Sequence, residues 1–358
     1  MDIKDSSILQ IVPKLPGSPD GVGTYASNLA KRLSAEYGVV SRFATGEDLA
    51  VVSQSAFRFV LLHYVNYGYQ NRGVPFRLAP ALRKLRGHGP NRLVTVFHEL
   101  YASAPPWRSA FWLKPFQRGI AQSIARLSDA CVITSGTALA QLRRLAPDVP
   151  VSIQPVFSGF GEPVLSPAQI AEKDSRRWVI CGGTALLEKS VRSFREILSH
   201  VPEAFSPREL FVLGGNDNEK VRAMLNDLRD VKWNYHPQID EPAASQILSR
   251  CSFGWMDYFH RPDAPVDALF KSSAFAALCA HGVIPVFPHQ TAPLALEEDC
   301  LPGLFSVDPV SARLPSPDER AKTGCEIHNW YHRCASLKRV TRVIAEALGL
   351  AVRPALTS

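Results

Sequence analysis

The chain has 358 residues and a mass of 39.4 kDa, which is long for a single hydrophobic core and predicts two domains. Hydrophobic residues make up 46% of the sequence and charged residues 20%, a composition that excludes a disordered chain. No apolar stretch approaches the ~18 residues of a membrane span. The first residues, with Asp2 and Asp5, lack the pattern of a signal peptide. We therefore expect a globular, cytoplasmic protein.

The net charge of +7 is unevenly distributed. Residues 1–150 hold 18 Lys and Arg against 9 Asp and Glu, a net charge of +9, whereas the remainder holds 22 against 24, a net charge of −2. Cations gather with aromatic residues in segment 76–127, at Arg77, Arg83, Lys84, Arg86, Trp107, Arg108, Phe111, Trp112, Lys114, Phe116 and Arg118. This mixture suits an anionic membrane surface, where each nearby cation contributes about 1 kcal/mol. The alternative is a core helix with a solvated basic face, and Pro115 is expected to kink or split it.

The cysteines predict neither disulfides nor a metal site. All seven are scattered and no two form a CxxC pair. Most lie in apolar stretches, where a buried thiol is the simplest interpretation. We therefore expect no structural zinc.

Apolar runs alternate with helical patterns along the chain, in two successive series. The expected strands are 7–13, 57–65, 92–99 and 130–135, then 177–183, 209–215, 231–236, 252–258 and 282–287. The expected helices between them include 23–36, 136–146, 188–200, 217–229, 241–250 and 271–280. Continuous apolar strands joined by crossover helices predict α/β domains with parallel sheets.

A Pro-, Gly- and Ser-rich stretch at 156–177 separates the two series. We expect one Rossmann-like domain at 1–160, a second at 170–327, and a final segment at 328–358. That segment contains a long helix at about 328–348, which is expected to pack back on the first domain.

Glycines and polar residues follow the expected strands, where parallel sheets carry their working groups. In the first half, Gly17, Gly21 and Gly23 open a helix and could admit an anion, although Ala26 breaks the GxGxxG pattern. His98 and Glu99 follow a later strand, where an imidazole can bind a sugar hydroxyl or transfer a proton. The alternative for His98 is a structural histidine.

The second half repeats this arrangement. Gly182, Gly183 and Thr184 precede a helix that carries Lys189, and Gly214 follows the next strand. Lys189 could reach a phosphate, or it could be an ordinary solvated lysine. His236 and Asp257 lie at the ends of the next strands, and Asp263 follows in the same loop as Asp257.

A further candidate site lies at Lys271, Ser272 and Ser273, which begin a helix of small residues that ends at Gly282. A cation, two hydroxyls and free N–H groups make a sensible phosphate site. The alternative is that Ser272 only caps the helix and Lys271 is solvated. We expect Gly282 to terminate the helix.

The motifs GVGTYASNLAKRL, VFHELY, VITSGTALAQLRR, CGGTALLEKSV, FVLGG and LCAHGVIPVF occur in the order and spacing of family 4 glycosyltransferases with the GT-B fold. The chain resembles that family over nearly its whole length. The resemblance implies two Rossmann-like domains facing across a cleft. It also implies a retaining, metal-independent hexosyltransferase with no cofactor, which uses a nucleotide-sugar donor, UDP- or GDP-linked, and a glycan or lipid-linked acceptor. The implied setting is cell-surface polysaccharide or glycolipid synthesis at the inner face of the membrane.

The resemblance implies roles for the residues that match the family's motifs: Gly21 and Gly23 in donor or acceptor binding, and His98 and Lys189 in catalysis. From their chemistry and positions we add Lys271 to the catalytic residues. In the same way we assign donor binding to Gly182, Gly183, Thr184, Gly214, His236, Asp257, Ser272 and Ser273, and acceptor binding to Glu99 and Tyr101. The family's paired glutamates are replaced by Leu269 and Ala277, which can neither bind a ribose nor stabilise charge. The arginine expected near Gly183 and Thr184 is also absent, and we expect Lys271 to replace it.

Two other functions remain open at this stage. A catalytically silent GT-B protein that binds or regulates partners in polysaccharide assembly would explain the missing glutamates. A nucleic-acid binder is suggested only by the pI near 9.1, and the diffuse charge without an RNA-binding pattern disfavours it.

Overall fold

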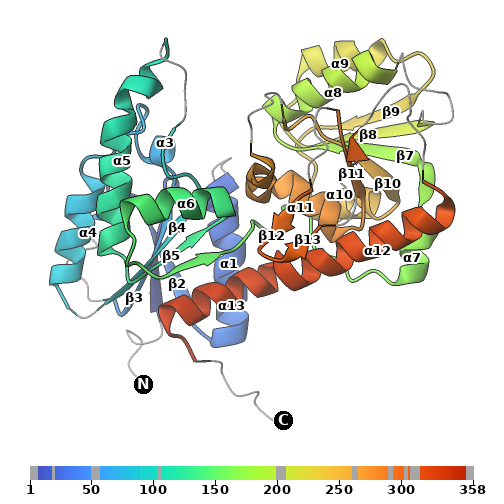
Figure 1. The fold of residues 1–358 in the computed structure, drawn as a ribbon. Coiled ribbons are helices and arrows are strands. Elements are labelled where there is room, and N and C mark those ends of the chain that lie inside the picture. The colour runs from blue at the N-terminus through green and yellow to red at the C-terminus, as the bar shows by residue number, and fades with distance from the viewer. Residues whose placement is uncertain are drawn as a thin grey trace, which may run out of the picture. The chain divides into compact units, whose positions relative to one another are not determined.

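The computed structural model describes residues 7–17, 21–49, 57–89, 91–102, 107–198, 207–259, 265–288, 293–301, 305–306 and 315–351. The chain divides into two compact units (Figure 1). The N-terminal unit consists of Met1–Pro155 together with Leu337–Ser358, and the C-terminal unit is Val156–Ser336. Each unit is built on a parallel six-stranded sheet with helices packed against it, so each is a Rossmann-like α/β domain.

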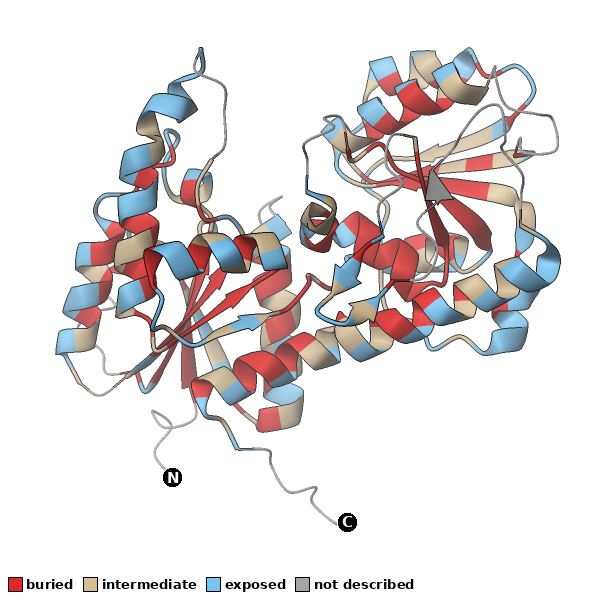
Figure 2. Ribbon diagram, in the orientation of Figure 1, coloured by how far each residue is buried: buried red, intermediate tan, exposed pale blue. Residues whose placement is uncertain are grey.

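The sheet of the N-terminal unit has the order β2-β1-β3-β4-β5-β6. Its strands are β1 (Ser7–Ile11), β2 (Val40–Ala44), β3 (Phe59–Tyr64), β4 (Arg92–Phe97), β5 (Ala130–Ile133) and β6 (Val151–Ile153). Its helices are α1 (Gly21–Tyr37), α3 (Asn66–Tyr69), α4 (Leu78–Gly87), α5 (Ser109–Leu127), α6 (Gly136–Leu145) and α13 (Leu337–Leu348). All neighbouring strands pair in parallel. The central strands β1 and β3 are buried throughout, which explains their continuous apolar sequences (Figure 2).

The two faces of this sheet pack against different helices. Val60 and Leu62 of β3 belong to a buried cluster with Leu82 of α4 and Ile124 of α5. Because successive side chains of a strand alternate between faces, His63 points to the other face. There it contacts the ring of Tyr25 on α1. This alternation places a buried polar group between the sheet and α1.

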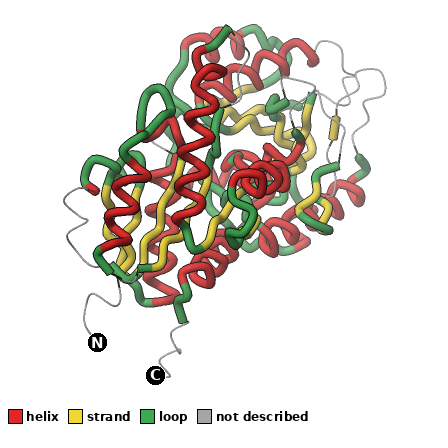
Figure 3. Tube along the Cα trace, turned by 60° about the vertical axis from the view of Figure 1, so that its left-hand side comes forward, coloured by secondary structure: helices red, strands yellow, loops and turns green. Residues whose placement is uncertain are grey.

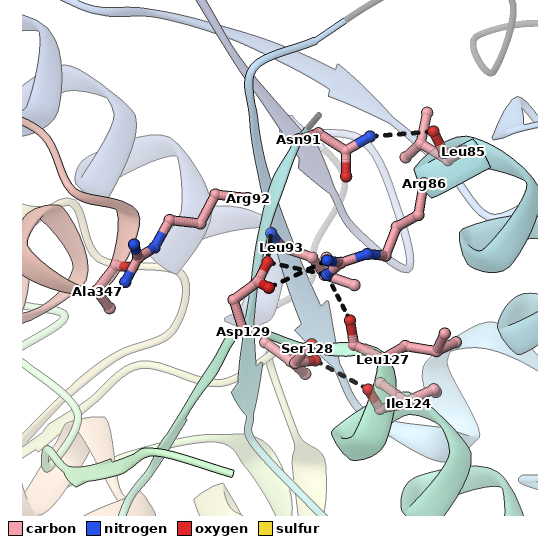
Figure 4. A network of polar contacts seen from close by, with 11 residues as sticks. Leu85, Arg86, Asn91, Arg92, Leu93, Ile124, Leu127, Ser128, Asp129 and Ala347 are labelled. Carbon is pink, nitrogen blue, oxygen red and sulfur yellow. Dashed lines mark hydrogen bonds and ion pairs between the residues drawn. The ribbon is translucent and has the colours of Figure 1, made fainter. Parts of the chain in front are cut away.

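The C-terminal helix α13 belongs to the N-terminal unit, where it contacts α1, β4 and β5. The Nε atom of Arg92, at the start of β4, donates a hydrogen bond of 2.6 Å to the carbonyl of Ala347 near the end of α13 (Figure 4). A cationic donor at this position satisfies a carbonyl that the last turn of the helix leaves without a partner.

An ion pair beside this contact fastens β4 to its neighbours. Arg86 donates two hydrogen bonds to the carboxylate of Asp129, of 2.8 and 3.0 Å, and one to the carbonyl of Leu127 (Figure 4). The same carboxylate accepts from the N–H of Leu93. Arg86 is therefore a structural cation and does not belong to the free basic surface of segment 76–127.

One local expectation about helices was wrong, and one half of a second, that Pro115 splits its helix, is contradicted. The long final helix expected at about 328–348 is two helices, α12 (Pro317–Cys334) and α13, separated at Ala335 and Ser336. Conversely, Pro115 does not split its helix, because α5 runs from Ser109 to Leu127 with Pro115 inside it. Pro115 is exposed, so its ring lies on the solvent side of the helix.

The sheet of the C-terminal unit has the order β14-β11-β10-β7-β8-β9. Its strands are β7 (Asp174–Cys181), β8 (Glu209–Leu213), β9 (Lys232–His236), β10 (Cys251–Trp255), β11 (Ile284–Phe287) and β14 (Phe305–Ser306), with a separate hairpin of β12 (Ala295–Leu296) and β13 (Asp299–Cys300). Its helices are α7 (Pro167–Ala171), α8 (Thr184–Leu198), α9 (Glu219–Asn226), α10 (Glu241–Leu248), the 3₁₀ helix η3 (Val266–Lys271), α11 (Ser273–Ala280) and α12. Figure 3 shows strands and helices in a second view.

Strand β10 is covered by helices on both faces. Trp255 donates from its indole N–H to the hydroxyl of Ser193 on α8, at 3.1 Å. On the opposite face, a Cβ added at Gly254 would lie 2.5 Å from the side chain of Leu278 on α11. Gly254 therefore lets α11 approach the sheet more closely than any side chain would permit.

Helix α11 ends as expected at Gly282. This residue has φ of 60°, and the N–H groups of Gly282 and Val283 donate to the carbonyls of Cys279 and Leu278. These are the two hydrogen bonds of a Schellman motif, which needs a left-handed residue after the helix.

Four of the seven cysteines, Cys131, Cys181, Cys251 and Cys279, are buried as free thiols. Of the helices within the described ranges, none is both long and apolar enough to cross a bilayer.

Candidate functional site

Two glycine turns meet at the carboxyl ends of β7 and β8 in the C-terminal unit. Gly182 and Gly214 both have positive φ, of 147° and 96°. A Cβ added at Gly214 would lie 2.7 Å from the carbonyl oxygen of Gly182, so the two backbones touch. Beside them, a Cβ at Gly183 would meet nothing within 4 Å. The turns thus present bare backbone with open space above Gly183.

Helix α8 begins in this open space. Its first residue, Thr184, accepts a hydrogen bond of 2.8 Å at Oγ1 from the N–H of Asn216, which follows the second glycine turn. The carbonyl of Gly183, the residue just before the helix, accepts the first hydrogen bonds of α8, from the N–H groups of Leu186 and Leu187. The first N–H groups of a helix have no partner within it and carry partial positive charge, which favours an anion at this place.

A second helix start, that of α11, lies next to the same strand ends. The Sγ of Cys181, the last residue of β7, contacts the carbonyl of Ala274 in the first turn of α11 at 3.7 Å. Ser272 is buried, and its Oγ accepts from the N–H of Phe275 at 3.2 Å, which makes it the N-cap of α11. The capping interpretation of Ser272 is therefore confirmed. Its hydroxyl keeps one O–H that can still donate to a ligand oxygen.

Lys271 and Ser273 flank this cap and are exposed. Within the described ranges, the ammonium of Lys271 has no hydrogen bond or ion pair, so its charge is not neutralised by a neighbouring carboxylate. Lys271 directly precedes the N-cap of α11, and an ammonium group beside a helix N-terminus is an arrangement that favours an anion.

The loop at 158–162 completes this surface, and the sequence analysis did not identify it. The ring of Phe160 lies 3.3 Å from a Cβ position at Gly214, and a Cβ at Gly159 would lie 3.8 Å from Oγ of Ser273. Tyr331 of α12 holds the loop, since its hydroxyl accepts from the N–H of Ser158 at 2.7 Å and donates to Glu162 at 2.5 Å. The Ser-Gly-Phe-Gly sequence was the available signal, but it was interpreted only as a domain break.

The remaining predicted residues of the C-terminal unit differ in whether they contact this surface. The carbonyl of His236 accepts from the N–H of Gly214 at 3.0 Å, so His236 adjoins the second glycine turn. Asp257 is buried, and its N–H donates to the hydroxyl of Ser190 on α8. Lys189 is exposed on α8 and contacts none of the other predicted residues through a hydrogen bond or ion pair in the described ranges. Asp263 lies outside the described residues.

The two positions where the resembling family carries glutamates are part of the core. Leu269 and Ala277 are both fully buried in the cluster under α11. Neither position could hold a carboxylate without a large desolvation cost, because an unpaired buried charge is strongly unfavourable. The apolar residues Leu269 and Ala277 therefore suit the buried positions that they occupy.

In the N-terminal unit, His98 follows β4 and joins a buried polar group. Its Nε2 lies 3.4 Å from Nδ1 of His63, and the edge of its ring meets that of Tyr25 at a centroid distance of 5.0 Å. Burial lowers the pKa of His98 to about 4, because desolvation disfavours the imidazolium. The pKa of His63 is lowered well below its usual value by burial and by its neighbour His98. Both rings are therefore neutral at pH 7.

The other predicted residues of this unit are more dispersed. Gly21 and Gly23 lie in the first turn of α1, where Gly21 is exposed with open space at its Cβ position and Gly23 is buried. Glu99 is exposed, and Tyr101 lies beneath two cations of α5, with Lys114 and Arg118 each 5.8 Å from its ring centre. Tyr101 is thus part of the aromatic and basic surface of α5.

No site for a metal ion is formed by three or more His, Cys, Asp or Glu side chains of the described residues. The chemistry available at the strand ends of the C-terminal unit is hydrogen bonding to an anion by backbone amides and hydroxyls, with the ammonium group of Lys271 at the start of α11. The chemistry available at His98 is hydrogen bonding by a neutral imidazole.

Comparisons with known proteins identify the fold. No protein-family model and no curated protein sequence matches the chain. Solved structures do resemble it over almost its whole length. One is an α-glucosyltransferase in complex with UDP-glucose and DNA containing an abasic site, with a TM-score of 0.59 and 11% identity, covering 96% of this chain and 99% of that one.

Two further structures are similar at the same identity of 11% and the same coverage of 96% and 99%. They are the lipopolysaccharide outer core galactosyltransferase WaaB, with a TM-score of 0.54, and WaaG, a glycosyltransferase involved in lipopolysaccharide biosynthesis, with a TM-score of 0.53. Two parallel Rossmann-like sheets, with a C-terminal helix that returns to α1, are the GT-B fold. The expected fold is therefore confirmed.

Proposed function

We propose that this protein is a glycosyltransferase that moves a sugar from a nucleotide-sugar donor to a glycan or lipid-linked acceptor. The observation that carries the proposal is the anion-accepting surface of the C-terminal unit, formed by the Gly183 turn, the start of α11 and Lys271. The similar solved structures support it, since all three reported above are described as glycosyltransferases and one holds UDP-glucose. A UDP- or GDP-linked hexose fits such a surface through its diphosphate.

The proposed mechanism follows from the charge that develops during transfer. The bond between the anomeric carbon and the diphosphate oxygen breaks as the acceptor oxygen bonds to that carbon, and the proton of the acceptor hydroxyl passes to the departing diphosphate. Negative charge grows on the leaving diphosphate while positive charge grows on the sugar. Fixed donors aimed at the leaving group lower the barrier, because they need no reorganisation as the charge appears. Lys271, the hydroxyls of Ser272 and Ser273, and the first N–H groups of α8 and α11 are the groups that would do this.

In this proposal no side-chain nucleophile and no metal takes part, and Lys271 replaces the family's missing arginine. Transfer would proceed with retention at the anomeric carbon, as the resemblance to family 4 implies. His98 would bind a sugar hydroxyl, and Glu99 and Tyr101 would contact the acceptor. Lys189 is a second candidate cation for the diphosphate.

The acceptor side of the proposal involves an anionic membrane. Five of the exposed large hydrophobic side chains are Phe76, Trp107, Phe111, Trp112 and Phe116, and all belong to segment 76–127. The ring centres of Phe76 and Phe116 are 6.1 Å apart, so the segment just before α4 shares this surface with α5. Apart from Arg86, which is paired with Asp129, the segment holds eight Lys and Arg against a single acidic residue, Glu99. Figure 2 shows the exposed side of α5.

Vesicle co-sedimentation tests the membrane surface. We expect the protein to bind vesicles rich in phosphatidylglycerol and to be released by salt, because screening weakens the attraction of the cations. Trp107→Ser with Trp112→Ser should reduce binding at least tenfold, since both indoles are exposed and each is worth over 1 kcal/mol when buried. The matched control is Val164→Ser, a hydrophobic residue of the C-terminal unit that is 87% exposed.

Binding that ignores both anionic lipid and salt would contradict the membrane surface. If duplex DNA displaces the protein from vesicles at physiological salt, the result favours the nucleic-acid alternative. DNA is tested because one of the similar structures contains it.

Release of nucleoside diphosphate tests the enzymatic function. Wild-type protein is incubated with UDP- and GDP-hexoses, with and without a membrane-lipid extract as acceptor, and the freed UDP or GDP is measured. We expect release from one donor that increases with the extract. Binding of a nucleotide sugar without release under any condition would favour the silent GT-B partner.

A further inference from the structure

A continuous line of buried polar side chains leads to His98 through the N-terminal unit. Gln10 of β1 donates from Nε2 to Oγ of Ser41 at 2.8 Å, and its Oε1 lies 2.9 Å from Nε2 of His63. Nδ1 of His63 in turn faces Nε2 of His98 at 3.4 Å. Gln10 and His63 are 0% exposed. Polar groups buried this deeply are costly to place between apolar strands unless they are hydrogen-bonded, so the arrangement calls for an explanation.

The two imidazoles meet edge to edge. Their planes are within 21° of parallel and their centres are 5.6 Å apart. The distance between Nδ1 of His63 and Nε2 of His98 is 3.4 Å. The difference from the distance between the ring centres is about two ring radii, as expected when both nitrogens lie on the line that joins the centres. This is the geometry of a hydrogen bond in the ring plane, here a long one, and not of stacked faces.

The orientation of the Gln10 amide determines where the protons lie along this line. With Oε1 of Gln10 facing His63, as in the structure, Nε2 of His63 carries the proton that it donates. A neutral His63 then has a lone pair on Nδ1, so Nε2 of His98 must be the donor between the two rings. In a neutral His98 this leaves Nδ1 as an acceptor. No described residue forms a hydrogen bond with Nδ1 of His98.

We infer that Gln10 and His63 are positioning residues that hold His98 as its Nε2–H tautomer, so that Nδ1 offers a lone pair to a hydroxyl of the substrate. This inference rests on the proposed function and deepens it by naming the residues that decide which nitrogen of His98 accepts from the hydroxyl. A lone pair accepts from an O–H group and repels phosphate or carboxylate oxygens. The ligand of His98 is thus a neutral sugar or acceptor hydroxyl, and the diphosphate is bound elsewhere.

The fold explains why this device is rigid. Gln10 and His63 lie on the adjacent strands β1 and β3, and His98 directly follows β4, which pairs with β3; backbone hydrogen bonds fix the registers of these strands. Tyr25 of α1 packs its ring edge on both imidazoles, at centroid distances of 5.7 and 5.0 Å. His98 therefore cannot exchange its two nitrogens by turning its ring without breaking this packing.

The decisive test reads the protonated nitrogen of each histidine directly. In protein labelled with 15N in the imidazole rings, long-range 1H–15N correlation spectra distinguish Nε2–H from Nδ1–H, and a His98→Gln sample assigns the signals. At pH 7 we expect both rings to be neutral with the proton on Nε2. A neutral His98 protonated on Nδ1, or a charged His98, would overturn the inference. No substrate is needed, so this outcome is independent of whether the protein transfers sugars.

Two variants of the same shape test the role of His63. Asparagine at position 63 keeps an acceptor oxygen near the place of Nδ1, and leucine has the same shape without it. We expect His63→Asn to preserve the Nε2–H tautomer of His98 and His63→Leu to lose that preference. Equal tautomer populations in both variants would overturn the role of His63. If either variant fails to fold, the wild-type spectrum still decides the tautomer.

Turnover gives a second readout once a donor and acceptor are known. His63→Leu should lower kcat about tenfold, which is the usual loss when a functional histidine loses the residue that orients it. His63→Asn should keep most of the wild-type kcat. A purely structural role of His63 would lower the yield of folded protein in both variants without this difference in kcat.

Discussion

Replacing Lys271 by methionine is expected to lower the kcat of sugar transfer about 100- to 1000-fold, the usual effect of removing one group that stabilises developing charge. Methionine keeps the length of the side chain and removes only the ammonium group. Because Lys271 is exposed and makes no ion pair within the described ranges, the folded protein should keep its stability. The measurement is single-turnover transfer on protein whose circular dichroism matches the wild type.

The matched control is Lys322→Met on α12, an exposed lysine of the same unit that lies 4.0 Å from Glu326. We expect it to leave turnover unchanged. If KM alone rises in Lys271→Met, the lysine contributes equally to substrate and transition state, and the leaving-group role is wrong. Turnover equal to the wild type would remove Lys271 from the site altogether.

Replacing Gly214 by alanine is expected to destabilise the C-terminal unit by about 2–4 kcal/mol, measured as a lower midpoint of urea unfolding. Two costs add. The residue has φ of 96°, which strains any side chain, and its Cβ would lie 2.7 Å from the carbonyl of Gly182. The neighbour is backbone, so it cannot move aside without displacing the first glycine turn.

Gly183→Ala is the control for this prediction, because its Cβ would meet nothing within 4 Å and its φ is not positive. We expect its urea midpoint to differ little from that of the wild type, by less than about 0.5 kcal/mol in stability. Equal midpoints for Gly214→Ala and Gly183→Ala would show that the two turns are not in contact as described.

The central strands were predictable from the sequence, whereas the edge strands β2, β6 and β14 were not; the edge strand β9 was expected at 231–236. Strands such as β1 and β3 are buried on both faces, so their sequences are continuously apolar. The edge strand β2 alternates between exposed and partly buried residues, and β6 has only three residues. Neither gives a continuous apolar signal, because an edge strand is covered on fewer sides.

The glycine turns could be predicted because their conformation is local. Gly182 and Gly214 each follow an apolar run, and positive φ at such a place needs glycine. The contact between the two turns could not be predicted, since it depends on the pairing of β7 with β8. The same holds for Phe160, whose loop is held near Gly214 by hydrogen bonds with Tyr331, a residue far along the chain.

The buried polar line to His98 left a signal that was overlooked. Gln10 and His63 are the polar residues within the otherwise apolar strands β1 and β3, apart from Ser7 and Tyr64 at their ends. A polar side chain in a fully buried strand needs a partner, and these two residues are 53 positions apart. Only the register of the sheet brings them together.

Calorimetric titration of nucleoside diphosphates and nucleotide sugars tests the central claim most directly, which is that the C-terminal unit binds a nucleotide sugar over the Gly183 turn and Lys271. The account predicts that one nucleotide binds wild-type protein and binds at least tenfold more weakly to Gly183→Ala and to Lys271→Met, while Lys322→Met matches the wild type. Absence of binding to wild-type protein, or equal affinity in all four proteins, would contradict it.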